Sequence, residues 1–152
     1  MANTIRLTAA QAMIRYIMVQ KNPRGEAFIA GAWAIFGHGN VAGIGEALHG
    51  VKDQFTTYRG HNEQTMAHAA IAYAKQLRRS RAMLVTSSIG PGATNMVTAA
   101  ALAHANRLPV LLVPGDVFAS RAPDPVLQQI EDFSDGTITA NDAFKPVSRY
   151  FD

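Results

Sequence analysis

The sequence predicts an α/β fold: a doubly wound, mostly parallel sheet with helices on both faces. Three observations lead to this fold class. Segments with apolar residues at helical spacing alternate along the chain with short apolar runs. These runs are continuous, as in strands that helices cover on both faces of a parallel sheet. A glycine-containing segment follows each of the first four runs, where a strand would turn toward the next helix.

The first helix is expected over residues 9–20. Thr8 precedes it, and a threonine hydroxyl can accept a hydrogen bond from a free N–H group of the first helical turn. Residues 27–36 are apolar and form the first expected strand. Asn40 is then expected to cap a short helix that ends near Gly50, because asparagine is a preferred cap.

The remaining elements follow the same alternation. In chain order they are a second strand at 55–58, a helix capped by Asn62 that runs to about residue 79, a third strand at 82–87, a helix at 93–106 and a fourth strand at 109–114. After Gly115 the pattern weakens. Residues 121–125 are expected to be a loop, residues 130–144 are ambiguous, and residues 146–151 are expected to form a final short strand.

The composition indicates one domain with an unusually neutral surface. A chain of 152 residues is long enough for a single core. Only 16% of its residues are charged, against about 25% in a typical globular protein. This shortfall indicates surface that another subunit or further domains would bury, and an alanine-rich chain with a neutral exterior is the alternative interpretation.

Several classes of protein are disfavoured. The basic cluster of Arg78, Arg79 and Arg81 has no aromatic residues interleaved with it, so nucleic-acid binding has little support. The absence of cysteine removes disulfide frameworks and thiolate metal sites. No apolar run reaches the roughly 20 residues of a membrane span, and the N-terminus does not have the pattern of a signal peptide. A soluble, cytoplasmic protein is therefore expected.

Ligands of an open parallel sheet bind beyond the carboxyl ends of its strands. Four segments should meet at that edge: residues 37–40, 59–63, 87–92 and 115–116. Each glycine in them is also explained as a plain strand-to-helix turn. A dinucleotide site is a weaker alternative, because the glycine spacing is one residue too long and the second strand ends in Arg59 rather than an acidic residue.

Glu63 is the main candidate for chemistry. It lies in the first turn of an expected helix at the ligand edge, although the helix dipole alone would favour a glutamate there. His61 is two residues away and does not share its helix face, and His68 is expected to be a packed or solvated histidine. Ser87 and Ser88 are not in the motif of a serine hydrolase or a phosphate-binding loop, and no metal-ligand spacing is present.

Three motifs occur in the order found in the N-terminal domain of the acetohydroxyacid synthase and pyruvate oxidase superfamily. They are IFGHG at 35–39, YRGHNEQTMAHAAIAYA at 58–74 and TSSIGPGATN at 86–95, the last with one insertion. The chain resembles the pyrimidine-binding domain of these thiamine-diphosphate (ThDP) enzymes over nearly its whole length. The His-Asn-Glu sequence at 61–63, IRLTAAQA at 5–12 and ANDAFK at 140–145 resemble the branch of hydrolases that act in myo-inositol catabolism.

The resemblance implies a ThDP-dependent hydrolase that cleaves a C–C bond in a cyclic 1,2-diketone. Glu63 would hydrogen-bond the N1′ atom of the cofactor's aminopyrimidine and so activate the cofactor. His38 would face the substrate for contact or proton transfer. Cofactor-binding residues would be Glu63, Gly39, Gly90, Pro91 and Gly92.

The same resemblance implies an assembly larger than this chain. Family members hold the diphosphate through Mg²⁺ on a separate domain with a Gly-Asp-Gly motif, which this sequence lacks, and their sites form between two chains. Residues 1–152 are therefore expected to be a single domain, inactive alone, that needs a second copy of itself and the partner chain's diphosphate-binding domain. Open alternatives are another ThDP-dependent carboligase or decarboxylase, a nucleotide-binding oxidoreductase, and a non-catalytic interaction module.

Overall fold

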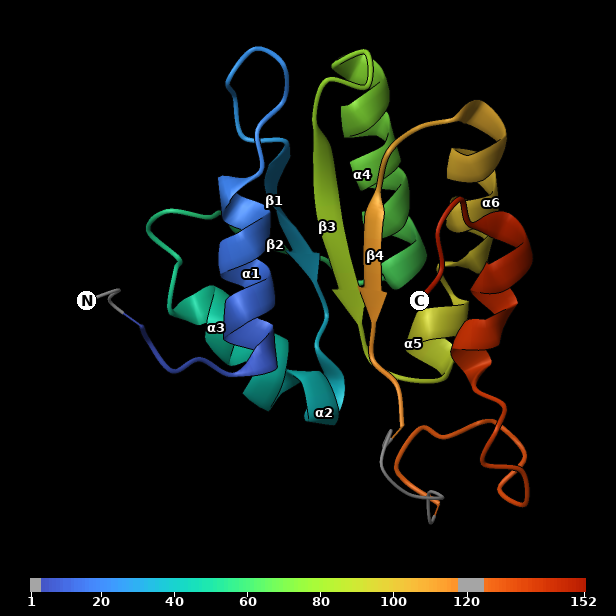
Figure 1. Cartoon of the computed structure of the whole chain (residues 1–152). Coiled ribbons are helices and arrows are strands. Elements are labelled where there is room, and N and C mark those ends of the chain that lie inside the picture. The colour runs from blue at the N-terminus through green and yellow to red at the C-terminus, as the bar shows by residue number, and fades with distance from the viewer. Residues whose placement is uncertain (1–3, 118–124) are drawn as a thin grey trace.

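The computed structural model describes residues 4–117 and 125–152, and its centre is a parallel sheet of four strands (Figure 1). The strands are β1 (Ile29–Ala34), β2 (Thr57–Arg59), β3 (Ala82–Ser87) and β4 (Leu111–Pro114). Their order across the sheet is β2-β1-β3-β4, and every pair is parallel. Strand β2 lies on one side of β1, whereas β3 and β4 lie on the other side. The order in which strands are added to the sheet therefore switches between β1 and β3. This confirms the predicted α/β class and places the expected ligand crevice at the β1–β3 boundary.

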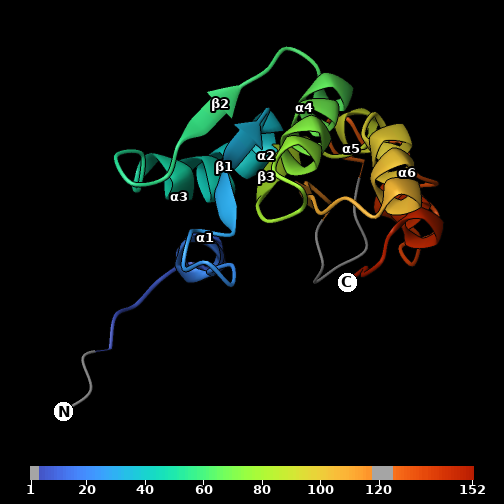
Figure 2. The ribbon, with the colours of Figure 1, turned by 90° about the horizontal axis from the view of Figure 1, so that it is seen from above.

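The helical elements cover both faces of the sheet (Figures 1 and 2). They are α1 (Ala9–Val19), α2 (Gly37–Asn40), the π-helical turn η1 (Val41–Gly45), α3 (Glu46–His49), α4 (Glu63–Gln76), α5 (Pro91–Thr94), α6 (Val97–Asn106) and the 3-10 helix η2 (Ala140–Val147). One apolar cluster joins α1 and α3 to the sheet, and a second joins α4, α6 and η2 to its other face.

Strand β3 shows why the apolar runs are continuous. Ala82 and Leu84 belong to the cluster with α1 and α3, whereas Met83 and Val85 belong to the cluster with α4 and α6. All six residues of β3 are buried, since successive side chains point to opposite faces and helices cover both. The predicted bounds of this strand, 82–87, are confirmed.

Two predicted helix caps are also confirmed. Thr8 forms a capping box with Gln11, in which the Thr8 hydroxyl accepts from the Gln11 N–H at 3.2 Å and the Gln11 side chain accepts from the Thr8 N–H at 3.0 Å. The Asn62 side-chain oxygen accepts from the Thr65 N–H at 2.9 Å and starts α4. The second cap matters for function because it fixes the first turn of the helix that carries Glu63.

The prediction that Asn40 caps a helix is wrong. Helical structure begins earlier, at Gly37, and Asn40 lies inside it with helical backbone angles. Gly37 has a φ of 65° and passes so close to Ser88 that a Cβ atom at residue 37 would overlap the Ser88 side chain. The Asn40 amide instead donates to the Ser87 carbonyl at 2.9 Å and ties α2 to the end of β3.

The expected strand at 146–151 is also wrong. Residues 140–147 form η2, and residues 148–152 form no strand. Thr139 starts η2, because its hydroxyl accepts from the Asn141 N–H at 2.9 Å. Phe144, only 4% exposed, packs into the cluster with α6. A helical turn buries this ring, and Pro146 lacks the N–H group that a strand ladder would need.

Two further differences concern element bounds. The single helix expected at 93–106 is two helices, α5 and α6, separated by Asn95 and Met96. The expected loop at 121–125 lies outside the described residues except for Pro125, which belongs to no helix or strand.

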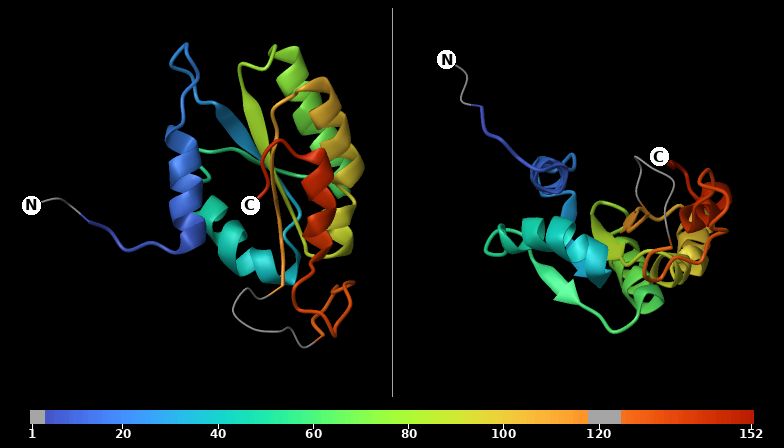
Figure 3. Two further views of the ribbon diagram at one scale, coloured as in Figure 1. Left: turned by 45° about the vertical axis from the view of Figure 1, so that its right-hand side comes forward. Right: turned by 90° about the horizontal axis from the view of Figure 1, so that it is seen from below.

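The free edge of β4 borders a wide hollow. Within the described part of the chain, β4 pairs only with β3, and its four residues are half-buried. A hollow of about 1570 Å³ lies along this edge, between β4, η2 and residues 147–152. Figure 3 shows the C-terminal segment beside η2. Glu63, His38, Gly39, Gly90, Pro91 and Gly92 do not line this hollow, whereas Asp116 of the expected edge segment 115–116 does.

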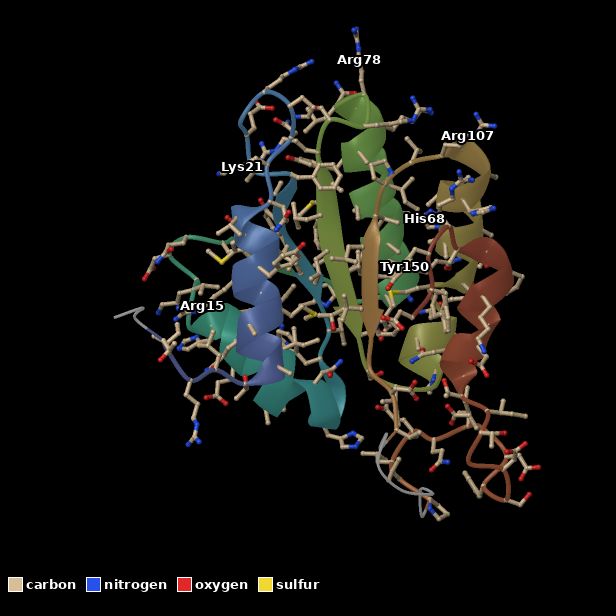
Figure 4. The ribbon with its side chains drawn as sticks, viewed as in Figure 1. Arg15, Lys21, His68, Arg78, Arg107 and Tyr150 are labelled. Carbon is tan, nitrogen blue, oxygen red and sulfur yellow. The ribbon has the colours of Figure 1, made fainter. Side chains whose placement is uncertain are left out.

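The arginine cluster lies at the end of the sheet where the strands begin, as the positions of Arg78 and Arg107 in Figure 4 show. The Arg79 Nε donates to the Arg107 carbonyl at 2.9 Å, and the Arg81 Nε donates to the Ala27 carbonyl at 2.9 Å. These guanidinium groups therefore hold loops in place, at the opposite end of the sheet from the expected ligand edge.

Over the described ranges, no helix has both the length and the apolar character needed to span a membrane.

Candidate active site

The candidate site lies where the loops after β1, β2 and β3 meet at the carboxyl edge of the sheet. Strand β1 leads into Gly37, β2 leads into Glu63, and β3 leads into Ser88. The side chains predicted from the sequence are thus gathered at one edge because parallel strands all end there. Two adjoining regions form at this edge, one around Glu63 and one around His38.

Glu63 is the first residue of α4 and is half-buried. The Asn95 side-chain amide donates to Glu63 Oε2 at 3.0 Å. Asn95 stands at the end of α5, so this hydrogen bond joins the start of one helix to the end of another. The carboxyl group is therefore held from a second element and does not swing freely into solvent.

Gly92 lies directly beside the other carboxyl oxygen. A Cβ atom at residue 92 would be 3.2 Å from Glu63 Oε1 and would overlap Ser88 Oγ. Oε1 therefore faces the Gly92 backbone, and the Ser88 hydroxyl group lies beside the same point. Of the three residues predicted in the loop after β3, Gly92 is the one that the structure brings to Glu63.

Gly90 and Pro91 are placed differently. Gly90 has a φ of 58° and is packed against the Gln128 backbone, which a Cβ atom at residue 90 would overlap. Pro91 is exposed at the first turn of α5. Gly90 therefore shapes the loop that carries Gly92, and Pro91 starts the helix that carries Asn95.

His38 and Gly39 are exposed residues of α2. They help to line a cavity of about 230 Å³ between the ends of β1, β3 and β4, whose other walls are Phe36, Gly37, Asn40, Ser88, Ile89 and Asp116. Glu63 does not line this cavity. Ser88 connects the two regions, since its side chain lies against Gly37 on one side and Gly92 on the other.

The sequence placed Ser88 in an expected edge segment but gave it no individual role, and it did not single out Asn95 as a partner of Glu63. Both were within the recognised motif at 86–95, but nothing in the spacing indicated that Asn95 would reach a residue 32 positions away. The break between α5 and α6 creates that contact, because it leaves Asn95 at a helix end. Ser88 is 6% exposed and is placed by the close approach of Gly37, which a sequence pattern does not reveal.

Among the described residues, neither histidine near Glu63 is hydrogen-bonded to its carboxyl group. His61 is exposed, and His68 is half-buried midway along α4 (Figure 4). Among residues 4–117 and 125–152, no three His, Asp or Glu side chains are grouped so that they could hold a metal ion.

These features define a class: a parallel α/β domain that presents one half-buried carboxyl group beside a glycine loop, at the edge where such sheets bind small molecules. The chain belongs to the thiamine pyrophosphate enzyme family, in which it is the N-terminal TPP binding domain. The family model matches residues 30–135, which include all the predicted site residues. Thiamine pyrophosphate is another name for ThDP, so the predicted family is confirmed.

Curated relatives match the chain from end to end. A 3D-(3,5/4)-trihydroxycyclohexane-1,2-dione hydrolase from Geobacillus thermodenitrificans is 55% identical over 99% of this chain and 24% of its own length. A similarly named protein from Bacillus cereus is 53% identical over 98% of this chain and 24% of its own length. One from Shouchella clausii is 52% identical over 100% of this chain and again 24% of its own length. The chain thus spans about a quarter of the length of the curated relatives that it matches.

Proposed function

We propose that this chain is the pyrimidine-binding part of a ThDP-dependent hydrolase that cleaves a C–C bond in a cyclic 1,2-diketone during myo-inositol degradation. The names of relatives that are 52–55% identical over nearly the whole chain support this substrate class. The observation that carries the role within the enzyme is the half-buried Glu63 carboxyl at the ligand edge, held by a neutral amide.

The residues around Glu63 fit an aminopyrimidine ring. A ring nitrogen of this kind needs a carboxyl group with which to share a proton, and Glu63 Oε1 lies beside the backbone of Gly92 in the loop after β3. No cation neutralises this carboxyl, since the single ion pair among the described residues joins Lys145 to Asp142. Glu63 is therefore free to interact with a ligand atom.

Each residue of the site has a proposed task. Bound ThDP supplies a nucleophilic carbon that can add to a substrate carbonyl. Glu63 holds and releases a proton at N1′ of the pyrimidine ring. The backbone of Gly90, Pro91 and Gly92 shapes the wall against which the ring is held. His38 and Gly39 border the small cavity, where His38 contacts the substrate or transfers a proton.

The overall reaction is balanced with water alone. Water adds across the bond between the two carbonyl carbons of the 1,2-diketone, and that C–C bond breaks. One carbon becomes a carboxylic acid and the other an aldehyde, so no external oxidant or reductant is needed.

We further propose that the diphosphate and its Mg²⁺ are held by a domain outside residues 1–152, supplied by a second copy of the polypeptide. The chain has no Gly-Asp-Gly sequence, and its relatives are about four times as long. The low charge and the half-buried edge strand β4 leave surface for further parts of the protein to cover.

The test uses the full-length polypeptide with ThDP and Mg²⁺. Trihydroxycyclohexane-1,2-dione should be converted to an open-chain acid, followed by NMR, and conversion should stop when ThDP is omitted. Pyruvate is the control substrate. Release of CO₂ or a condensed product from pyruvate, with the cyclic diketone left intact, would instead assign a decarboxylase or carboligase.

A further inference from the structure

We propose that Asn95 is a positioning residue for Glu63: its side-chain amide fixes which carboxyl oxygen is presented to the cofactor. The proposal rests on the proposed function and adds to it a residue on a different helix. It is carried by one hydrogen bond and by the different surroundings of the two carboxyl oxygens.

The hydrogen bond is anchored at both ends. Asn95 Nδ2 donates to Glu63 Oε2 at 3.0 Å. The Asn95 backbone N–H donates to the Pro91 carbonyl at 3.1 Å, so α5 fixes the position from which the amide reaches out. Glu63 is fixed by the Asn62 cap at the first turn of α4. Both side chains are half-buried, and within the described ranges no other side chain is hydrogen-bonded to this carboxyl.

An amide N–H group can only donate. While it donates to Oε2, that oxygen accepts, and the carbonyl oxygen of a protonated carboxyl is a better acceptor than its hydroxyl oxygen, so a proton carried by Glu63 is favoured on Oε1. Oε1 in turn lies 3.2 Å from the point where a Cβ atom at Gly92 would be, beside backbone that has no side chain. The proton-carrying oxygen is thereby directed toward the loop that carries Gly92 and Ser88, against which the ring is proposed to bind.

The geometry also makes removal of the amide a clean experiment. Asn95 has ordinary helical backbone angles, φ −63° and ψ −16°, which alanine and aspartate adopt without strain. Its backbone hydrogen bond does not involve the side chain. Asn106 is a matched control, because its amide donates to a backbone carbonyl, that of Leu102 at 2.9 Å, on the exposed end of α6.

The experiment compares Asn95→Ala, Asn95→Asp, Asn106→Ala and Glu63→Gln in the full-length holoenzyme. The main measurement is exchange of the C2 proton of bound ThDP with deuterated solvent, followed by NMR after acid quench. ThDP affinity by calorimetry and the melting temperature are recorded for each variant. Loss of a hydrogen bond to a charged group should slow exchange about 10-fold to 100-fold in Asn95→Ala. Asn106→Ala should exchange at the wild-type rate.

Asn95→Asp tests whether residue 95 acts as a hydrogen-bond donor or only as a packing group. Aspartate keeps the shape of asparagine, but its ionised carboxylate only accepts and would face a second carboxylate. The proposal predicts that this variant exchanges at least as slowly as Asn95→Ala. A wild-type rate in Asn95→Asp would assign packing alone and overturn the proposal.

Other outcomes are equally decisive. Wild-type exchange in Asn95→Ala, with exchange abolished in Glu63→Gln, would overturn the role of Asn95 and leave the proposed function standing. Wild-type exchange in Glu63→Gln would remove the proposed function itself. A melting temperature of Asn95→Ala far below that of Asn106→Ala would make the residue structural and would also overturn the proposal.

Discussion

A methyl group added at Gly92 tests the geometry of the site most sharply. In Gly92→Ala the new Cβ atom would overlap Ser88 Oγ and would lie 3.3 Å from Ser88 Cβ and 3.2 Å from Glu63 Oε1. Without this overlap, alanine inside helix α5 would stabilise the fold by about 0.5–1 kcal/mol relative to glycine. The overlap therefore decides whether Gly92→Ala raises or lowers the free energy of unfolding. Overpacking of this kind costs about 1–3 kcal/mol. Gly92→Ala is therefore expected to lower the stability of the chain and to disturb the position of the Glu63 carboxyl group.

The control is Gly39→Ala, at the other predicted cofactor-binding glycine. No atom lies within 4 Å of a Cβ atom built there, and its φ is not in the left-handed region. This substitution should be neutral or stabilise the chain by up to about 1 kcal/mol. The two alanines should therefore have opposite effects on the free energy of unfolding.

Thermal unfolding of the chain measures both effects. The overpacking cost less the helical gain of alanine is at most about 2.5 kcal/mol, and 1 kcal/mol changes the melting temperature of a domain of this size by about 2–4 °C, so Gly92→Ala should melt up to about 10 °C lower. The double variant Gly92→Ala with Ser88→Ala should recover part of this loss, with a coupling energy of about 0.5 kcal/mol or more. Equal stability of Gly92→Ala and Gly39→Ala would refute the close packing of Gly92, Ser88 and Glu63.

Three further predictions concern the fold and the assembly. Thr8→Ala removes the capping box of α1 and should lower the free energy of unfolding by about 1 kcal/mol in urea denaturation; an unchanged midpoint would show that the cap contributes nothing. The hydrogen bond from Lys145 is the main reason that the pKa of Asp142 lies below its ordinary value of 3.8. The stabilisation of the fold by this ion pair is therefore fully present above about pH 3.8 and is lost as the pH falls through the lower folded-state pKa of Asp142. Lys145→Met should flatten the dependence of the free energy of unfolding on pH in that range. A pH dependence parallel to that of the wild type would argue against the ion pair. The chain should self-associate in sedimentation, through α4 and the helices α5 and α6 that follow β3; a concentration-independent monomer would count against this.

The elements predicted well are those whose signals are local or repeated. The apolar run of β3 and the caps at Thr8 and Asn62 each depend on a few neighbouring residues, and the structure confirms them. The parallel order of the strands then brings Glu63 and the loop after β3 to one edge without further information.

The errors arise where a distant contact overrides a local preference. Asn40 is a good cap by type, but its amide is engaged with the Ser87 carbonyl 47 residues away. The segment at 146–151 is apolar enough for a strand, yet burial of Phe144 against α6 selects a 3-10 helix instead. Asn95 was missed for the same reason, since its partner Glu63 belongs to another helix.

The central claim is that Glu63 shares a proton with the pyrimidine ring of ThDP. The most direct measurement is the rate at which the C2 proton of ThDP exchanges with solvent when bound to full-length Glu63→Gln. We expect the exchange rate to fall at least about 100-fold, the contribution of a positioned acid–base group, with circular dichroism and melting temperature unchanged. An exchange rate equal to that of the wild-type enzyme would contradict it.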